Sequence, residues 1–244
     1  MASIAVRSVS FVDIADLHAT AHLGAPVQIV HHSILPRGFA DAYALLVDGR
    51  MEGFAGVWIR HHPGRITSWY LSPSAEPSET ELLRTLQEES GAHELEVQTN
   101  VGSGAQLLRD TASETWTEKL LFEDAGRFEL APPGVRLRPR SESDDGPDGE
   151  WVLEQGSRLV GAGGVMTHYN HPFADLYMEV IEDMRGQGYG SYLVQELRRV
   201  CIESGLIPAA RCDEHNEASR RALLRGGLVE CGRLVAGSLT PLLR

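Results

Sequence analysis

The stretch Met178-Glu-Val-Ile-Glu-Asp-Met-Arg-Gly-Gln-Gly-Tyr-Gly-Ser-Tyr-Leu-Val-Gln-Glu-Leu197 decides the fold of this chain. Residues 176–181 are rich in aromatic and β-branched side chains and predict a strand, and the glycines within 185–190 predict a tight turn. Apolar residues at three- and four-residue spacing then predict a helix over 189–201. Because the free N–H groups at a helix start favour an anion, the stretch predicts a site for a phosphate or pyrophosphate.

Arginines gather around this loop and around the helix that follows it. An anionic ligand would need cations at this place, although solvated surface arginines are the alternative interpretation for most of them. The arginines concerned are Arg185, Arg198, Arg199, Arg211, Arg220, Arg221 and Arg225. On the predicted helix, Gln195, Arg198 and Arg199 are expected to face water, because the apolar residues occupy the opposite face.

The composition is that of a soluble globular protein with an excess of acidic residues. The 244 residues carry a formal net charge of -12, which argues against a nucleic-acid partner because phosphate binding needs clustered cations. The apolar runs are too short for a membrane span and the first residues show no signal-peptide pattern, so we expect a cytoplasmic protein without a membrane partner. Cys201, Cys212 and Cys231 lack metal-ligand spacing and are expected to be reduced core or near-core residues.

A composition shift at Ala131-Pro-Pro-Gly134 predicts a boundary between two domains, residues 1–131 and 132–244. Much of the same element order begins again after it, which we interpret as an internal duplication. The matched segments are 43–59 with 151–166, 66–71 with 176–181, and 94–98 with 209–212. The first copy has no counterpart of the loop 185–190, so we expect it to have lost the phosphate loop. Strands with intervening helices and hairpins predict an α+β (mixed α/β) fold with a mixed sheet in each half.

A second motif follows the glycine loop. The segment Asn216-Glu-Ala-Ser-Arg-Arg-Ala-Leu-Leu-Arg-Gly-Gly-Leu228 predicts a helix that begins at an asparagine and ends at glycines. Together with the strand and the loop Arg185-Gly-Gln-Gly-Tyr-Gly190, it resembles the GNAT superfamily of acyl-CoA N-acyltransferases. The resemblance implies two GNAT-like domains, the first degenerate, each a mixed, mostly antiparallel twisted sheet flanked by helices. A dinucleotide-binding fold is the other nucleotide interpretation of the glycines, but the hairpin just upstream argues against its strand order.

The resemblance also implies where acetyl-CoA, the acyl donor, would bind. Backbone amides of residues 185–190 would hold the pyrophosphate, and Val180 with its neighbours would pair with the pantetheine arm like an added strand. Asn216 and Ser219 would contact the same arm or cap the helix, and Arg220 or Arg221 would meet the adenosine phosphates. The implied cofactor-binding residues are Met178, Val180, Arg185, Gly186, Gln187, Gly188, Tyr189, Gly190, Ser191, Asn216, Ser219 and Arg220.

The reaction implied by the resemblance is direct attack of a neutral primary amine on the thioester carbonyl, as in acyltransferases of the EC 2.3.1 type. The positions where many relatives carry an acid or a base hold Leu223, Arg211 and Ala174 in this chain. We therefore expect Glu179 or Asp175 to be the base, and the alternative for each is a strand carboxylate that faces solvent. The alternative function is a non-catalytic acyl-CoA-binding or regulatory module.

The acceptor side of the site is less well marked. Residues 141–149 stand where the first half has a helical segment, which helps to wall the acceptor pocket in the family that the chain resembles. We therefore expect an acceptor site that is open or completed by the first half. The acidic surface favours a cationic acceptor, either a small-molecule amine or a peptide amino group. For the protein itself we expect a monomer or a homodimer. His168 and His171 have no third ligand at useful spacing, so we predict no metal site.

Overall fold

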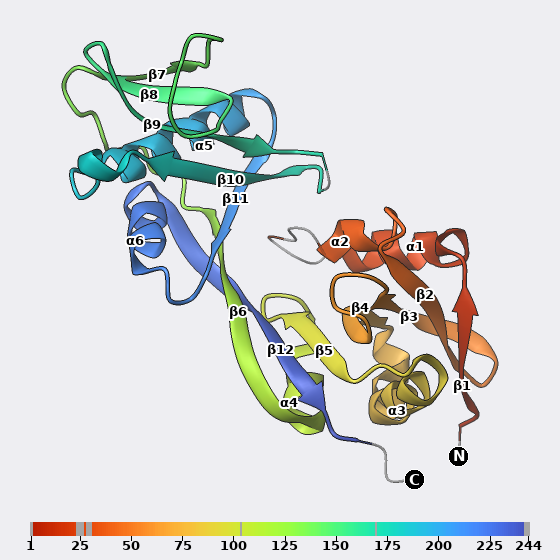
Figure 1. The fold of residues 1–244 in the computed structure, drawn as a ribbon. Helices are drawn as coiled ribbons and strands as arrows, with labels where there is room; N and C mark the ends of the chain where they lie inside the picture. Colours follow the sequence, from red (N-terminus) through yellow and green to blue (C-terminus); the bar gives the residue numbers. More distant parts are fainter. Residues whose placement is uncertain (1, 23–26, 28–30, 103, 169, 242–244) are drawn as a thin grey trace. The chain divides into compact units, whose positions relative to one another are not determined.

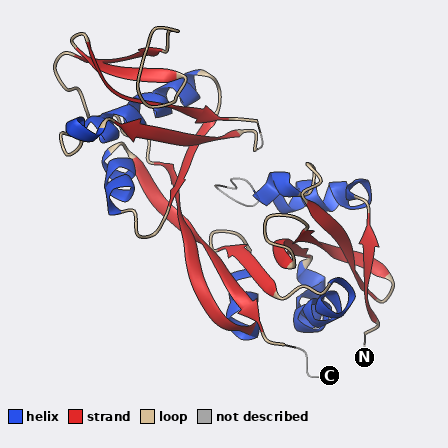
Figure 2. Ribbon diagram, in the orientation of Figure 1, coloured by secondary structure: helices blue, strands red, loops and turns tan. Residues whose placement is uncertain are grey.

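The computed structural model describes residues 2–22, 27, 31–102, 104–168 and 170–241. The chain packs as two compact units (Figure 1). Unit 1 holds the residues up to Glu118 together with those from Arg233 onward, and unit 2 holds Lys119–Gly232. Each unit is a mixed, mostly antiparallel sheet with helices packed against it (Figure 2), which confirms the predicted fold class.

Unit 1 begins with a strand, two helices and a hairpin. Its elements are β1 (Ile4–Val9), α1 (Phe11–His22), α2 (His31–Ile34), β2 (Ala40–Val47), β3 (Arg50–Trp58), β4 (Arg65–Leu71), the 3-10 helix η1 (Pro73–Ser78), α3 (Glu79–Ser90), β5 (Glu94–Gln98) and α4 (Gly104–Thr111). The strands lie in the order β1-β2-β3-β4-β5. Neighbouring strands are antiparallel except β4 and β5, which are parallel and pair at Arg65 with Glu94 and at Ile66 with Leu95.

Unit 2 repeats this order without helices between its first two strands. Its elements are β7 (Val135–Pro139), β8 (Trp151–Gln155), β9 (Arg158–Met166), β10 (Phe173–Val180), the 3-10 helix η2 (Glu182–Met184), α5 (Tyr189–Glu203), β11 (Ile207–Cys212) and α6 (Glu217–Arg225). The strands lie in the order β7-β8-β9-β10-β11 and are antiparallel except for β10 and β11. The same order with the same parallel pair in both units confirms the predicted duplication.

Two long strands belong in part to each unit. β6 (Ala112–Asp124) follows α4 of unit 1, but its residues 120–123 pair with β11 of unit 2. β12 (Leu228–Leu239) follows α6 of unit 2, but its residues 234–238 pair with β5 of unit 1. Each sheet therefore contains a strand that follows the last helix of the other unit. The domain boundary at residues 131 and 132 stays a prediction. The residues from Arg233 onward pack with unit 1, because β12 pairs with β5.

Helix α5 covers the sheet of unit 2 with the apolar face that its spacing predicts. Leu193, Val194, Leu197 and Cys201 are fully buried on this face. Burying a side chain such as leucine stabilises a fold by about 1.5–3 kcal/mol, so this face alone anchors the helix. Helix α3 covers the sheet of unit 1 in the same way with its three buried leucines.

The polar side of α5 differs from the prediction. Of the three residues expected to face water, Gln195 and Arg198 are buried, and only Arg199 is exposed. Arg198 binds the carboxylate of Asp124, and Gln195 pairs with the N–H and C=O groups of Leu130 at 2.7 and 2.8 Å. The segment after β6 therefore covers this side of the helix, which the amphipathic pattern of the helix alone does not reveal.

The cysteines are free thiols, as predicted. Cys201 and Cys212 are buried and Cys231 is partly buried. Burial raises the pKa of Cys201 to about 12 and that of Cys231 to about 11, so both stay protonated at neutral pH. Within the described ranges, no helix combines the length and the apolar character that a bilayer span needs.

Candidate active site

The loop between β10 and α5 leaves main-chain N–H groups open at the helix start. Gly186 and Gly188 have φ values of 78° and 90°, a backbone conformation that strains any residue with a side chain. Gly188 is the N-cap of α5, no side chain caps the helix there, and its first turn contains no acidic residue. The first N–H groups of a helix have no partner within it, so these groups and the helix dipole are available to an anion.

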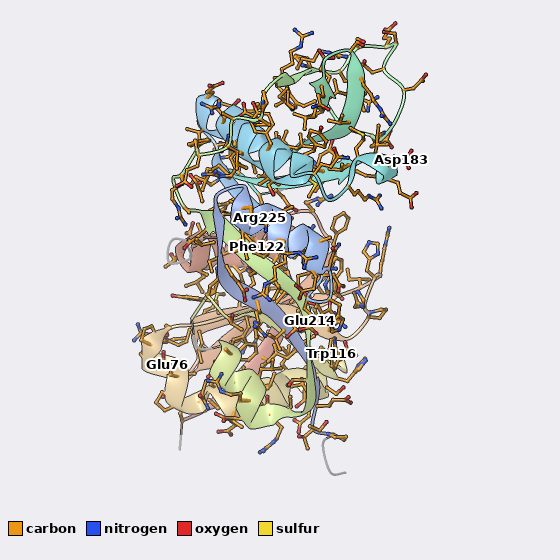
Figure 3. All side chains as sticks on the ribbon, turned by 90° about the vertical axis from the view of Figure 1, so that its left-hand side faces the viewer. Glu76, Trp116, Phe122, Asp183, Glu214 and Arg225 are labelled. Atoms are coloured by element: carbon orange, nitrogen blue, oxygen red, sulfur yellow. The ribbon has the colours of Figure 1, made fainter. Side chains whose placement is uncertain are left out.

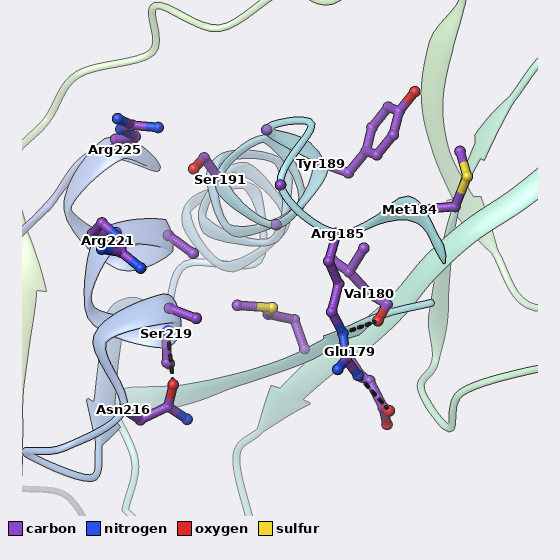
Figure 4. A pocket seen from close by; sticks show the side chains of 16 residues that line it. Glu179, Val180, Met184, Arg185, Tyr189, Ser191, Asn216, Ser219, Arg221 and Arg225 are labelled. Carbon is purple, nitrogen blue, oxygen red and sulfur yellow. Dashed lines mark hydrogen bonds and ion pairs between the residues drawn. The ribbon is translucent and has the colours of Figure 1, made fainter. Parts of the chain in front are cut away.

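This loop forms one side of a cavity of about 350 Å³, between β10, the start of α5 and α6 (Figure 4). Most of the residues predicted for the site line it. They are Met178, Glu179, Val180, Arg185, Gly186, Gly188, Tyr189, Gly190, Ser191, Asn216 and Ser219. Three predicted residues, Gln187, Arg220 and Asp175, are not among the lining residues.

Three arginines give the cavity its positive charge. Arg185 comes from the loop, and Arg221 and Arg225 come from α6, one helical turn apart (Figure 4). Arg220 instead turns to β12, where its Nη2 donates to the Glu230 carboxylate at 3.0 Å. The open N–H groups and these cations fit the pyrophosphate and the adenosine phosphate of coenzyme A.

Polar side chains fix the frame of the cavity. The Asn216 carboxamide oxygen accepts from the backbone N–H of Ser219 at 3.0 Å and caps α6, as one of the two predicted roles for this residue requires. The Tyr189 hydroxyl donates to the side-chain oxygen of Gln155 at 2.6 Å. Because the Tyr189 ring is buried in this way, the residue can serve an anion by its main-chain N–H group.

The main chain of β10 offers an open strand edge to the cavity. β11 pairs with β10 as far as Asp175, whereas β9 pairs with it as far as Val180. Ile181 donates its N–H to β9, and main-chain groups alternate in direction, so those of Met178 and Val180 point away from β9. The Val180 carbonyl accepts from Arg185 Nε at 3.0 Å. The main-chain N–H and C=O groups of Met178 therefore point to the open edge of β10. An extended ligand that pairs with β10 as an added strand would bind to these groups.

The two predicted carboxylates occupy different environments. Glu179 lines the cavity, its side chain is 61% exposed, and one carboxylate oxygen lies 3.7 Å from Arg185 Nη2. Asp175 is buried, and its Oδ2 lies 3.1 Å from Nε of Arg211 on β11. The strand alternation places both side chains on the face of β10 opposite to Met178 and Val180. A single strand face thus carries one accessible and one enclosed carboxylate.

The sequence matches the profile of the acetyltransferase (GNAT) family over residues 104–227, slightly more than half of the chain. The chain belongs to this family. GNAT proteins use acetyl-CoA as the acyl donor, which agrees with the charge and the open strand edge of the cavity. A search of curated proteins finds no significant match.

Solved structures share this GNAT fold. An acetyltransferase of the GNAT family from Colwellia psychrerythraea has a TM-score of 0.74 at 18% identity, with 97% of this chain and 100% of that chain covered. A tandem GNAT protein from the clavulanic acid biosynthesis pathway has a TM-score of 0.63 at 13% identity, with 98% and 100% covered. A GCN5-related N-acetyltransferase from Sphaerobacter thermophilus has a TM-score of 0.62 at 14% identity, with 98% and 97% covered. The tandem arrangement predicted from the duplication thus exists in a solved relative.

The other face of the GNAT strand β10 carries the loop 140–150 in place of helices. Arg138 donates to both oxygens of Asp144 at 2.7 Å, and Arg140 donates to the Gly149 carbonyl at 2.7 Å, so the loop is held at several points. Burial raises the pKa of the Tyr177 hydroxyl on β10, and the nearby charge of Glu150 raises it further. Acidic loop residues therefore lie beside the face on which Asp175 and Glu179 stand.

Sequence reasoning missed Met184, Ala218 and Ala222 as lining residues, and it named Arg225 only as one of several arginines near the loop. Arg225 lies one helical turn after Arg221, and this spacing on one helix is the signal that would have found it. Met184 lies on η2, and its burial shows no periodic signal in the sequence. Within the described ranges, no group of three or more histidine, cysteine or acidic side chains is arranged to hold a metal ion.

Proposed function

We propose that unit 2 transfers the acetyl group of acetyl-CoA to a primary amine by direct attack. The observation that carries this proposal is the combination of an uncapped helix start, flanking arginines and an open strand edge in one cavity. Phosphates at the helix start and pantetheine along β10 would direct the thioester toward the point where β10 and β11 separate. Such orientation contributes several kcal/mol to lowering a barrier.

The main-chain N–H groups of β10 would stabilise the charge that develops on the thioester oxygen. Those of Met178 and Val180 point to the open edge, and the Arg185 guanidinium already binds the Val180 carbonyl. The thioester would lie toward the point where β10 and β11 separate, which is nearer to Met178 than to Val180, so the N–H of Met178 is our candidate for the oxyanion donor. A donor on a paired strand needs no reorganisation during the reaction, since β9 holds β10 in place.

For the base we propose Glu179, directly or through a water molecule. Most amines are protonated at neutral pH, so the ammonium group must lose a proton before its nitrogen attacks the carbonyl carbon. The carbon–sulfur bond then breaks, the coenzyme A thiolate leaves, and the proton that the new amide nitrogen loses passes to that thiolate. Glu179 is accessible and lines the cavity, whereas Asp175 is buried against Arg211, so Asp175 remains our second candidate.

For the acceptor we propose a cationic amine. Glu179 lines the cofactor cavity from the face of β10 opposite to Met178 and Val180, and the acidic loop residues Asp148 and Glu150 lie beside Tyr177 on that same face. Their negative charge attracts an ammonium group and disfavours an anionic acceptor. The acceptor approaches a face walled by a loop rather than by helices, which suits acceptors of varied shape.

One observation favours the non-catalytic alternative. Leu223, at the position of the acid in many relatives, is buried in the core, and Arg211 occupies a position where some relatives carry a base. Titration with acetyl-CoA followed by release of free thiol in the presence of primary amines separates the two functions. The enzyme binds acetyl-CoA and releases thiol in proportion to the amine, whereas thiol release that no amine accelerates would reject the transferase.

A further inference from the structure

Unit 1 contains its own cavity, of about 370 Å³, where its parallel strands separate. The pairing of β4 with β5 ends at Ile66 and Leu95, and the next residues of both strands line the cavity. Helices α1 and α2 contribute His18, His31 and His32 to the lining. The cavity thus lies where β4 and β5 separate, which is the counterpart of the place where β10 and β11 separate in unit 2.

The residues that follow β4 are unsuited to a pyrophosphate. In place of the glycine loop, unit 1 has η1, with the sequence Pro-Ser-Ala-Glu-Pro-Ser. Pro73 and Pro77 have no N–H group to donate, and Glu76, labelled in Figure 3, lines the cavity with a negative charge. We therefore do not assign this cavity to coenzyme A.

Two buried polar atoms at the cavity have no hydrogen-bond partner among the residues that the structure describes. They are Oγ1 of Thr67 on β4 and Oε1 of Gln98 on β5. These residues are only 3% and 7% exposed, and both line the cavity. A buried polar atom without a partner costs about 1–3 kcal/mol, so a ligand that pairs with both atoms would recover this free energy. The carboxamide oxygen can only accept, so the ligand must donate.

The charges around the cavity favour a cationic donor. Glu96, which lines the cavity, lies 2.6 Å from His31 Nε2 and 2.8 Å from Arg65 Nη1. Arg65 also binds Glu94 and Glu118, so one guanidinium faces three carboxylates and negative charge is in excess. Glu76 adds to this excess.

Aromatic rings form the rest of the wall. Phe54, Trp69 and Tyr70 line the cavity, and the rings of Phe54 and Tyr70 stack with centroids 5.8 Å apart. His18 and His32 stack at 4.0 Å. An ammonium group is attracted to aromatic faces, and an apolar group attached to it would pack against them.

We propose that the cavity of unit 1 binds a small primary ammonium compound with an apolar or aromatic group. Its nitrogen would donate to Gln98 Oε1 and Thr67 Oγ1, and its apolar part would lie against Phe54 and Tyr70. This site is separate from the acetyl-CoA cavity of unit 2, and the proposal does not depend on the transferase reaction.

The test is isothermal titration calorimetry of the full chain with 2-phenylethylamine, and with phenylacetate as the anionic compound of similar shape. At about pH 8, where free histidine side chains are neutral, we expect the amine to bind and phenylacetate not to bind. Gln98→Leu removes the acceptor and should weaken amine binding at least about tenfold, and Thr67→Val by about threefold. Equal binding of the two compounds, or no binding of the amine, would overturn the proposal.

Two further measurements locate the probe and test the state of the two atoms. Glu179→Gln changes unit 2, so it should bind the amine like the wild type; loss of binding in this variant alone would place the probe in unit 2 and refute the site. Because the two polar atoms lack partners, Thr67→Val and Gln98→Leu should leave the midpoint of thermal unfolding unchanged or raise it. A lower midpoint in both would show that the atoms are paired within the protein, which also contradicts the proposal.

Discussion

Units 1 and 2 share a strand order and a parallel strand pair that opens into a cavity, yet the chemistry of the two openings differs. After β10, unit 2 has glycines with positive φ, an uncapped helix and arginines. After β4, unit 1 has prolines and a glutamate in a 3-10 helix. The fold therefore provides an opening in each unit, and a few residues after one strand decide whether it can receive a phosphate.

Each parallel strand pair carries a partly buried ion pair, and the two ion pairs have opposite arrangements. In unit 1 the arginine is on β4, with Arg65 Nε 2.7 Å from Glu94 on β5. In unit 2 the carboxylate is on β10, with Asp175 Oδ2 3.1 Å from Arg211 on β11. The duplicated units keep an ionic link between the parallel strands with the partners exchanged, which fits a structural role for both links.

The largest difference that we expect concerns Glu96 of unit 1. Burial opposes its charge, but His31 and Arg65 lower its pKa from 4.5 to about 2. Because the pKa of Glu96 is lower in the folded protein than in the unfolded chain, the charged carboxylate stabilises the fold at pH values above 4.5. This stabilisation is lost as the pH falls from 4.5 through about 2. Over this window the wild type should lose about 3 kcal/mol more free energy of unfolding than Glu96→Gln.

Urea unfolding at a series of pH values measures this effect. Glu88→Gln, on the exposed side of α3, is the matched control and should follow the wild type. Parallel pH profiles for the wild type and Glu96→Gln would show that the network of unit 1 does not depend on this charge.

The next largest effect concerns the reaction assigned to unit 2. Glu179→Gln should lower kcat at neutral pH by about a hundredfold, the lower end for loss of a general base, because water can reach this exposed site. The KM for acetyl-CoA should change less than about twofold, because the amide keeps the shape of the side chain. Glu182→Gln, on the neighbouring η2, is the control for loss of one negative charge. An equal loss in both variants would remove Glu179 from the role of base.

A smaller effect is expected from filling the cavity that distinguishes unit 2. A Cβ atom at Gly190 would lie 3.5 Å from Ala222 and from Val180, so alanine fits but leucine enters the cavity. Gly190→Leu should weaken acetyl-CoA binding by about thirtyfold, while Gly190→Ala should bind within about threefold and gain helix stability. Calorimetric titration with acetyl-CoA measures the affinity of both variants. Equal affinities of the two variants would place the cofactor elsewhere.

The smallest effect separates two neighbouring arginines of α6. Arg221 lines the cavity, so Arg221→Ala should weaken acetyl-CoA binding by about fivefold, and less so at high salt because the charge is exposed. Arg220 pairs with Glu230, so Arg220→Ala should bind within about twofold of the wild type. The reverse order would assign the phosphate contact to Arg220.

Much of this architecture is predictable from local sequence signals. The glycine loop and the asparagine at the start of α6 act within a few residues of their own positions, and both occur where the sequence predicts them. The turn at Asp48 and Gly49, with φ values of 49° and 76°, is another feature of this kind, because aspartate followed by glycine favours a tight turn between two strands. Local chemistry decides these features, so distant contacts do not change them.

The features that sequence reasoning missed depend on distant partners. A strand pattern over 112–124 does not say which strand β6 pairs with, and residues 228–239 lie outside the segments for which we predict strands. Gln195 and Arg198 occupy the polar side of an amphipathic helix, yet the segment after β6 buries them. The pairing of Asp175 with Arg211 likewise requires two separate strands, β10 and β11, to meet.

The shared strands have a consequence for synthesis on the ribosome. Unit 1 is translated before unit 2, but its sheet needs residues 234–238 of β12, which follow all of the residues of unit 2. Unit 2 contains all of its residues once Gly232 has emerged. The unit that is made first is therefore completed last. While unit 2 is being translated, the edge of β5 that later pairs with β12 has no strand bound to it.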